Sequence, residues 1–328
     1  MMKKTILILA TLTLVAPGAF SADGDGGYAG SFLQVPLGAR PAAIGGAYIG
    51  VSDDASGIMY NPAGLAGIPY REFTSSYRVM KLDRKLGYAS AIFPIQGMAS
   101  LGVQWLYAGS GSVEERDRDG ALVGRDISQN THQLGVTFAK RFEPWISVGA
   151  NLSYLFSKMS EISANSVGFD FGVMIHLTEL IDREKRDLFF AEDAKIGFVA
   201  RNLTKQLRWN SEKYLKKYST DGTGFTQTDK FPIEAGLGAS SRFLDRKLLI
   251  AADATKNEKQ SFKGRFGAEY EIRPEFVLRS GYSAYGFSAG AGFQFDVSPK
   301  RTLAIDYAFT SGRADEGGEH LFSLGLRF

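Results

Sequence analysis

The fold class is decided by a segment in which apolar and polar residues alternate, WISVGANLSYLF at residues 145–156. One face of this segment carries apolar side chains, namely Ile146, Val148, Ala150, Leu152, Tyr154 and Phe156. The opposite face carries small or polar residues, namely Ser147, Gly149, Asn151 and Ser153. A period of two residues is typical of a β-strand with one apolar face. Soluble β-sandwiches and membrane β-barrels both show this pattern, so further features must decide between them.

The same alternation recurs from about residue 72 to residue 328. Fourteen strands are expected, at 72–80, 86–96, 98–107, 130–141, 145–157, 165–177, 194–203, 231–242, 247–255, 262–271, 275–284, 286–296, 301–311 and 318–328. Tilted strands need about 9–11 residues to cross a bilayer, whereas ordinary globular strands have about 5–6. An even number closes a barrel with both termini at one end. We therefore expect an all-β fold, a transmembrane antiparallel β-barrel of about 14 strands over residues 71–328.

The connections between these strands alternate in length, as they do in outer-membrane barrels. The links at 97, 142–144, 243–246, 272–274 and 296–300 are short, whereas those at 108–129 and 204–230 are long and charged. Short periplasmic turns and long outer loops are the usual arrangement. The link at 178–193 is long where the alternation requires a short one, and its charge pattern predicts a short surface helix.

Composition and the first residues indicate an exported, nearly neutral protein. Lys and Arg (38) nearly balance Asp and Glu (35), which gives no electrostatic case for a nucleic-acid partner. The chain has 0 Cys and 3 His, so disulfides and thiolate metal sites are excluded, and we expect neither a metal nor a cofactor. Residues 1–21 are typical of a cleavable signal peptide, with Lys3 and Lys4 before an apolar stretch and small residues at Ala19 and Ser21.

The end of the chain indicates the outer membrane of a diderm bacterium. Phe322, Leu324, Leu326 and the terminal Phe328 share one face of the last expected strand. This ending is similar to the sorting signal that outer-membrane assembly machinery recognises, which makes that machinery an expected partner. Aromatic residues at opposite strand ends, Trp105 and Tyr107 against Phe142 and Trp145, suit the two aromatic girdles of such a barrel. Outer-membrane lipid and lipopolysaccharide are then expected to surround it.

Residues 22–70 lack strand periodicity and are rich in small residues, which predicts a compact segment folded into the lumen as a hatch. Asn61 and Pro62 suit a helix start, with Asn as N-cap and Pro at the first helical position. Asp53 or Ser52 is expected to cap a preceding turn. An ordinary periplasmic extension is the alternative to a hatch.

This segment also carries a family resemblance. It contains Gly38-Ala39-Arg40, Gly45-Gly46-Ala47, Asp53-Asp54-Ala55-Ser56 and Tyr60-Asn61-Pro62-Ala63-Gly64-Leu65-Ala66. These residues resemble the N-terminal signature of the PorV/PorQ-type outer-membrane proteins, which are relatives of the fatty acid transporter FadL. The resemblance covers the mature chain and implies a 14-stranded barrel with a hatch. In FadL-type members, hydrophobic molecules bind inside and leave through an opening in the wall; PorV-type members serve a protein secretion system.

No arrangement of residues for catalysis is evident, and we expect that the protein is not an enzyme. His132, His176 and His320 lie in different strands, and none has a Ser two residues away on its face. Arg40 is expected to hold a lumen carboxylate bidentately, or else to receive the carboxylate of a ligand. The candidate ligand or hatch–wall contacts are Arg40, Asp170, Glu234 and Asp306.

The expected function is passive, hatch-gated uptake of hydrophobic or amphipathic small molecules such as long-chain fatty acids. The expected ligand is therefore a hydrophobic small molecule. The Gly-rich strand around Gly286 to Gly292 is a place where a kink would open the wall at little cost. The alternative is a PorV-like component of a secretion or surface-assembly system, whose partner is another protein.

Overall fold

The alternating segments form one closed antiparallel sheet in a computed structural model, which describes residues 28–116, 119–160, 162–181, 191–211, 226–284, 286–311 and 317–328. The expected signal peptide at 1–21 lies outside the described residues. The strands of the sheet are β1 (Glu72–Val79), β2 (Lys85–Ile95), β3 (Ala99–Gly109), β6 (Gln129–Glu143), β7 (Ile146–Met159), β8 (Ile162–His176), β9 (Glu192–Arg201), β12 (Glu234–Phe243), β13 (Leu248–Asn257), β14 (Gln260–Arg273), β15 (Phe276–Ser283), β16 (Gly286–Ser298), β17 (Arg301–Thr310) and β18 (Glu319–Arg327). All fourteen predicted strands are confirmed.

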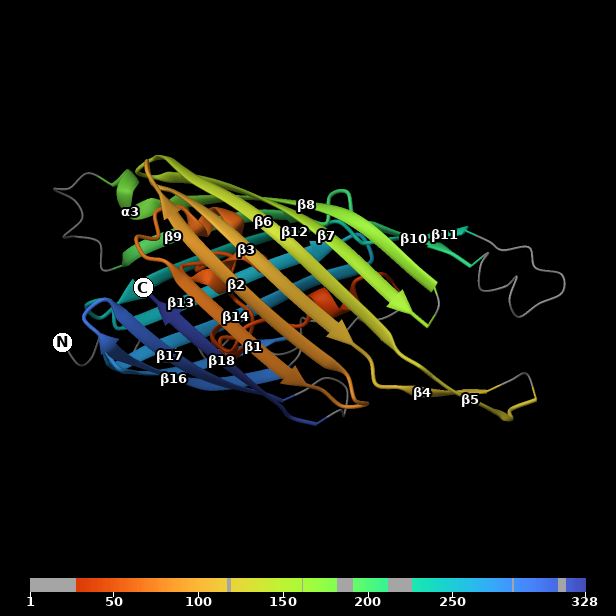
Figure 1. Ribbon diagram of the computed structural model, residues 1–328. Coiled ribbons are helices and arrows are strands. Elements are labelled where there is room, and N and C mark those ends of the chain that lie inside the picture. Colours follow the sequence, from red (N-terminus) through yellow and green to blue (C-terminus); the bar gives the residue numbers. More distant parts are fainter. Residues whose placement is uncertain are drawn as a thin grey trace.

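Each strand pairs with its neighbours in chain order, and the barrel closes where β1 pairs with β18, from Glu72 opposite Arg327 to Arg78 opposite Leu321. The two termini of the described barrel therefore lie at the same end. The backbone of Arg71 exchanges hydrogen bonds of 2.9 and 3.2 Å with Phe328 at this end. Figure 1 shows this end on the left, together with the short helix α3 (Leu177–Leu180), which begins the long link whose helix was predicted.

The two long loops form hairpins that the sequence did not predict. β4 (Val113–Arg116) pairs with β5 (Leu122–Ile127), and β10 (Gln206–Asn210) pairs with β11 (Thr226–Lys230). These strands are short and largely polar, so their residues lack the apolar alternation from which strands were predicted. Both hairpins project from the end opposite the chain termini (Figure 1). Among the described residues, no helix is long and apolar enough to cross a membrane.

The alternation separates a lipid-facing surface from a polar lumen. Leu134, Val136 and Leu152 are 56–58% exposed on the outer surface, although all three are aliphatic. Their neighbours on the lumen side, such as Gln133 and Asn151, are buried. An apolar outer band around a polar interior is the pattern of a transmembrane barrel. The terminal residues Phe322, Leu324 and Phe328 are likewise exposed on this outer surface.

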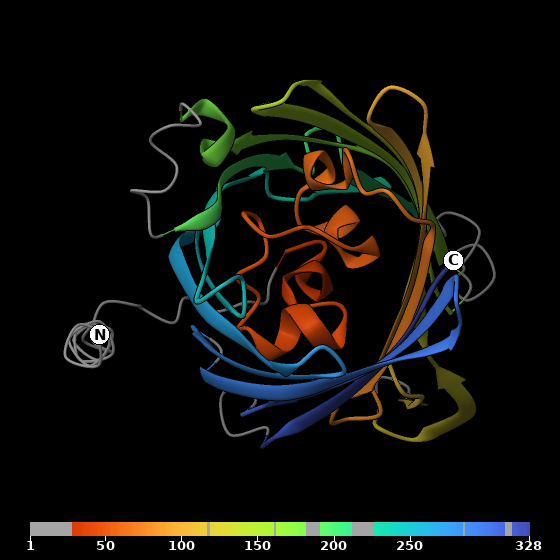
Figure 2. The ribbon, with the colours of Figure 1, turned by 90° about the vertical axis from the view of Figure 1, so that its left-hand side faces the viewer.

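Residues 28–70, called the hatch below, lie inside the barrel (Figure 2). They form η2 (Ser31–Gln34), α2 (Ala39–Ala43), η3 (Ala55–Met59) and η4 (Pro62–Leu65). The start of η4 is as predicted, since the Asn61 side chain accepts a hydrogen bond of 3.1 Å from the Ala63 N–H. The prediction for the preceding turn was wrong, because Asp54 rather than Asp53 or Ser52 caps η3. Asp53 instead points toward two arginines.

Glycines in the wall allow the hatch backbone to approach closely. Gly45 has φ of 69° and lies against β14 and β15, where a side chain on Gly281 would overlap the backbone of Ile44 and Gly45. Gly290 likewise faces Ala43 of α2. The Gly-rich part of β16 shows no break in pairing: it pairs with β15 from Gly286 to Phe293 and with β17 from Ser288 to Asp296, and a register shift follows only between Asp296 and Ser298. Its glycines leave room for the hatch, because no Cβ intervenes.

Candidate functional site

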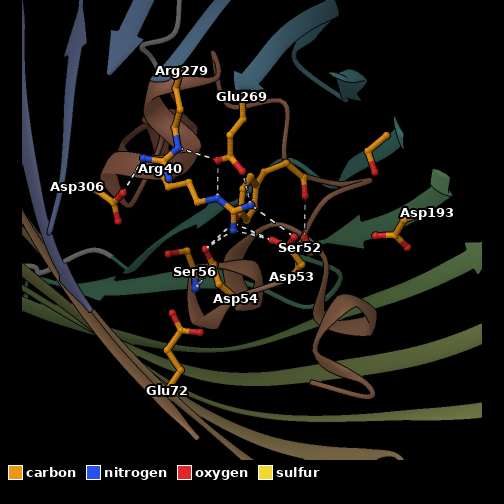
Figure 3. Close-up of polar contacts among 12 residues, drawn as sticks. Arg40, Ser52, Asp53, Asp54, Ser56, Glu72, Asp193, Glu269, Arg279 and Asp306 are labelled. Carbon is orange, nitrogen blue, oxygen red and sulfur yellow. Dashed lines mark hydrogen bonds and ion pairs between the residues drawn. The ribbon is translucent and has the colours of Figure 1, made fainter. Parts of the chain in front are cut away.

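Arg40, at the start of helix α2, lies among three carboxylates inside the barrel (Figure 3). Its Nε and Nη2 donate to the two oxygens of Glu269 on β14, at 2.9 and 3.2 Å. Its Nη1 lies 2.6 Å from Oδ1 of Asp53 and 2.9 Å from Oδ2 of Asp54. Arg40 thus pairs bidentately with a wall carboxylate and joins it to two acidic residues of the hatch. Of the two alternatives, these contacts correspond to the structural one.

The Arg40 contacts continue in both directions into the wall. Glu269 also accepts a hydrogen bond of 2.7 Å from Nε of Arg279 on β15, and Arg279 Nη1 donates to Asp306 on β17 at 2.6 Å. On the other side, Nη2 of Arg242 on β12 lies 3.2 Å from Asp53. We call these residues, Asp306, Arg279, Glu269, Arg40, Asp53, Asp54 and Arg242, the Arg40 network. It connects the hatch to four strands of the barrel.

The charges of the Arg40 network keep Asp53 ionised. Burial alone would raise the pKa of the Asp53 carboxyl, but Arg40, Lys195 and Arg242 together hold this pKa well below its usual range. The phenol of Tyr48 is buried beside Arg40 and donates to Asp54 at 2.6 Å. Burial raises the pKa of Tyr48, so the phenol remains a hydrogen-bond donor. The Arg40 network is therefore a saturated set of charge-assisted hydrogen bonds rather than a vacant anion site.

Two further polar contacts attach the hatch elsewhere in the barrel. Oδ2 of Asp253 on β13 accepts hydrogen bonds from the backbone N–H groups of Tyr48 and Ile49, at 2.7 and 2.8 Å. Asn61 donates through Nδ2 to the carbonyl oxygen of Ile49 and to that of Val173 on β8, at 3.2 and 3.1 Å. Asn61 is therefore both the cap of η4 and a contact between hatch and wall. These bonds satisfy backbone groups that would otherwise be buried without partners.

The remaining predicted contact residues divide into two groups. Glu234 reaches the hatch, because its carboxylate accepts from Gln34 at 3.1 Å and from Arg201 at 2.7 Å. Asp306 reaches the hatch only through Arg279. Asp170 does not fit the prediction: it accepts from Asn151 and from the backbone N–H of Asn202, both at 2.8 Å. Asp170 thus joins β7 and β8 to the turn after β9, whereas the hatch contact on the same strand is made by Val173.

The small residues of the predicted hatch motif lie where φ is positive or where neighbouring atoms leave no room for a larger side chain. Gly38, Gly45 and Gly46 have positive φ values of 83°, 69° and 78°, which favour glycine. A side chain on Gly64 would overlap Ser52 within the hatch. Pro62 and Ala63 are buried against the wall at Gly149, where a side chain would overlap them. The motif therefore defines the shape of the hatch, and its charged members Arg40, Asp53 and Asp54 provide its attachment.

The sequence shows no histidine with a serine two residues away on the same face, but the fold brings one serine and one histidine from neighbouring strands together. Ser147 Oγ on β7 lies 3.2 Å from Nε2 of His176 on β8. The other neighbour of the imidazole is Arg141, whose Nη2 lies 2.7 and 2.9 Å from the two ring nitrogens. A cation at this place disfavours the imidazolium that a general base must form. The signal that would have found the pair is strand register: Ser147 lies opposite Met174, so His176, two residues further along β8, is its diagonal neighbour on the same face.

Several hatch contacts were not predicted, above all Arg242 and Glu269. Both are charged residues at lumen-facing positions of the alternation, so the same reasoning that selected Asp306 could have found them. In the described parts of the chain, no cluster of His, Asp and Glu has the arrangement of a metal site.

Comparison with known proteins finds this architecture among solved structures. No protein-family model and no curated protein sequence matches the chain. Among solved structures, the toluene transporter TbuX of Ralstonia pickettii has a TM-score of 0.60 at 12% identity, with 90% of this chain and 98% of that chain covered. The toluene transporter TodX of Pseudomonas putida has a TM-score of 0.58 at 12% identity, covering 89% and 97%. A FadL homologue of Pseudomonas aeruginosa has a TM-score of 0.56 at 15% identity, covering 88% and 97%.

The chain has the FadL-type barrel fold. Identities of 12–15% establish the fold alone, because one fold supports many functions. In this FadL-type barrel, the feature with functional potential is the hatch. It occupies the lumen and is held by polar contacts from strands that include β8, β12, β13 and β14.

Proposed function

We propose that this protein is an outer-membrane channel for passive uptake of hydrophobic or amphipathic small molecules, and that movement of the hatch opens it. The observation that carries the proposal is that hydrogen bonds and ion pairs, with Arg40 at their centre, join the hatch to the wall in addition to the apolar clusters between them. Such contacts are exchanged for contacts with water when a segment moves, unlike a continuous apolar interface. The similarity of the fold to the toluene transporters TbuX and TodX also supports uptake of apolar molecules.

The route into the membrane would use a break in strand pairing between β8 and β9. β9 pairs with β8 only from Phe171 opposite Ala200 to His176 opposite Lys195, whereas β8 continues up to Ile162. Beyond Phe171, toward Ile162, single hydrogen bonds join β8 to the segment after β9: Asn202 N–H to Asp170 Oδ1 at 2.8 Å, Leu203 N–H to Phe169 O at 3.0 Å, Thr204 Oγ1 to Val167 O at 3.2 Å and Gln206 N–H to Ser166 Oγ at 2.8 Å. We call this part of the wall the seam. Among the described residues no strand ladder crosses the seam, so only these single hydrogen bonds must break to open it.

An apolar groove on the outer surface supports an exit at the seam. The groove has a volume of about 410 Å³ and lies across β3, β6, β7 and β8. It is lined mainly by Val103, Leu134, Val136, Leu152, Tyr154 and Val167. Val167 also accepts the hydrogen bond from Thr204, so the groove ends at the seam. An apolar molecule that leaves the lumen there would meet an outer surface that is also apolar.

A reversible disulfide between hatch and wall would test hatch gating. The chain has 0 Cys, so Ala39→Cys with Ser323→Cys would introduce a single pair at a place where the Ala39 N–H donates to Ser323 Oγ at 2.7 Å. Uptake of radiolabelled oleate and naphthalene would be measured in diderm cells that lack their own channel. We expect uptake to be blocked when the pair is oxidised and restored by a reductant. Both single-Cys variants should be insensitive to the reductant.

Each outcome addresses a different part of the proposal. Uptake that is equal in the oxidised and reduced double variant would refute hatch gating but leave uptake intact. Uptake no greater than in cells without the protein would refute the uptake function itself. In that case the PorV-like secretion role would become the hypothesis to test, by analysis of surface proteins in the deletion strain.

A further inference from the structure

Lys205 is a buried cation for which the proposed mechanism has so far provided no role. It ends the turn after β9, just inside the seam, and is 4% exposed. Its Nζ donates to Gln133 Oε1 at 3.1 Å and lies 5.7 Å from the centroid of the Phe231 ring. A side chain on Gly168 would overlap the Lys205 stem, so this position of β8 leaves room for the lysine.

Among the described residues, the ammonium of Lys205 has no ion-pair partner, in contrast to three lumen arginines. Arg40, Arg201 and Arg279 each form an ion pair of 2.6–2.7 Å with a carboxylate. Across the described ranges, no carboxylate oxygen lies within 4.0 Å of Lys205 Nζ. The charge of Asp170 interacts with Lys205 only at longer range. Burial lowers the pKa of the Lys205 ammonium. A buried cation with no counter-ion is costly for stability, so its presence calls for a function.

The surroundings of Lys205 are apolar on one side. Leu155, Ala164, Leu207 and Phe231 form a buried cluster, against which Phe32 and Leu33 of the hatch helix η2 pack. An ammonium has three N–H donors, and the bond to Gln133 uses one. The other two donors have no hydrogen-bond partner in the described part of the chain, and they lie at the edge of an apolar cluster, beside the seam. This combination suits a molecule with a small anionic head group and an apolar body.

We propose that Lys205 binds the carboxylate of an amphipathic ligand, whose apolar body replaces Phe32 and Leu33 against the cluster when η2 withdraws. This inference rests on the proposed uptake function and adds a preference for anionic over neutral amphiphiles. Among the described residues, η2 is joined to the wall by one side-chain hydrogen bond, of 3.1 Å from Gln34 to Glu234, and otherwise by the apolar packing of Phe32 and Leu33. A ligand held at Lys205 would lie next to the break in the wall, since Thr204 bonds across the seam.

Quenching of Trp209 fluorescence tests the proposal directly. Trp209 packs against the apolar cluster, and the other tryptophans, Trp105 and Trp145, would be replaced by Phe because they face the lipid side. The probes are 12-bromododecanoate and 12-bromododecanol, which differ only in the head group. We expect saturable quenching by the acid. The change Lys205→Met should weaken acid binding by about tenfold or more and alcohol binding by less than about threefold.

Two further variants complete the test. Lys205→Arg keeps the charge and should retain most of the acid binding, which separates loss of charge from misfolding. Lys256→Met removes an exposed lysine that lies 5.2 Å from a phenylalanine ring, Phe262, and should change nothing. Equal affinity for the acid in wild type and Lys205→Met, or no quenching of Trp209 by either probe, would overturn the proposal. Naphthalene uptake that persists in Lys205→Met would show that the channel function stands independently.

Discussion

Removal of the Arg40 side chain is expected to release the hatch. In Arg40→Ala, Asp53, Asp54 and Glu269 would lose the cation that joins them, while the barrel strands would keep their hydrogen bonds. Taking one partner from a buried ion pair typically costs about 3–5 kcal/mol. The lower end applies here, because Arg242 still faces Asp53 at 3.2 Å and Arg279 still faces Glu269 at 2.7 Å.

A loss of about 3 kcal/mol in hatch attachment corresponds to an opening equilibrium constant about 100-fold larger. The opening can be followed with one cysteine, since the chain has 0 Cys. Ser288 on β16 is 3% exposed and donates to the Ala43 carbonyl oxygen at 3.0 Å, so Ser288→Cys places a thiol on the wall behind the hatch. Its reaction with a water-soluble maleimide is expected to accelerate about 100-fold in Arg40→Ala when opening precedes labelling.

The control is an arginine of similar chemistry on the surface. Arg116 in the outer hairpin pairs with Glu114 at 3.7 Å, and both side chains are more than half exposed. Arg116→Ala should leave the labelling rate unchanged, because exposed ion pairs contribute about 0–1 kcal/mol. Heat-dependent gel mobility would verify that each barrel is folded. A folded Arg40→Ala protein that is labelled within about twofold of the wild-type rate would refute the view that Arg40 holds the hatch.

Three further predictions use the same thiol or the conductance of single channels. Gly281→Ala should speed labelling, because the new methyl overlaps the hatch backbone, whereas Gly325→Ala, whose nearest neighbour is at 3.4 Å, should not; equal rates would contradict the close contact. Asn61→Ala removes a cap and a wall contact, and should destabilise hatch attachment by about 1–2 kcal/mol, seen as roughly tenfold faster labelling. The pKa of Asp53 is lower in the folded than in the unfolded protein. The ionised carboxylate therefore stabilises hatch attachment at pH values above the unfolded-state pKa, and this stabilisation is lost as pH falls through the folded-state pKa. The conductance difference between wild type and Asp53→Asn should therefore be constant from about pH 7 to pH 4.5, and a difference that shrinks within that range would argue against a lowered pKa.

Strand prediction succeeded here for a specific physical reason. A strand that crosses the membrane has lipid on its outer face and a polar lumen on its inner face. The polarity of each side chain therefore shows which face it is on, as for the buried Ser147 and the exposed Leu152. The hairpins β4–β5 and β10–β11 have solvent on both sides, and no such contrast marks them. The helix start at Asn61 was also predictable, because capping depends only on neighbouring residues.

The site was predictable only in part. Arg40 could be recognised as a cation in a segment of small residues, but its partner Glu269 is 229 positions away along the chain. The glycines of β16 were interpreted as a kink, whereas a glycine in a strand is also where another backbone approaches. Choosing between these two requires knowing that Ala43 lies opposite Gly290.

The sequence by itself determined the barrel, its strand number, the faces of each strand and the existence of a compact segment before it, because these follow from local periodicity and composition. Tertiary structure decided which carboxylates surround Arg40, where pairing of the wall stops, and which described residues surround Lys205. These features depend on strand register and on the position of the hatch in the lumen, which bring together residues distant in the chain. Local sequence carries no record of such distances, so only the folded chain reveals them.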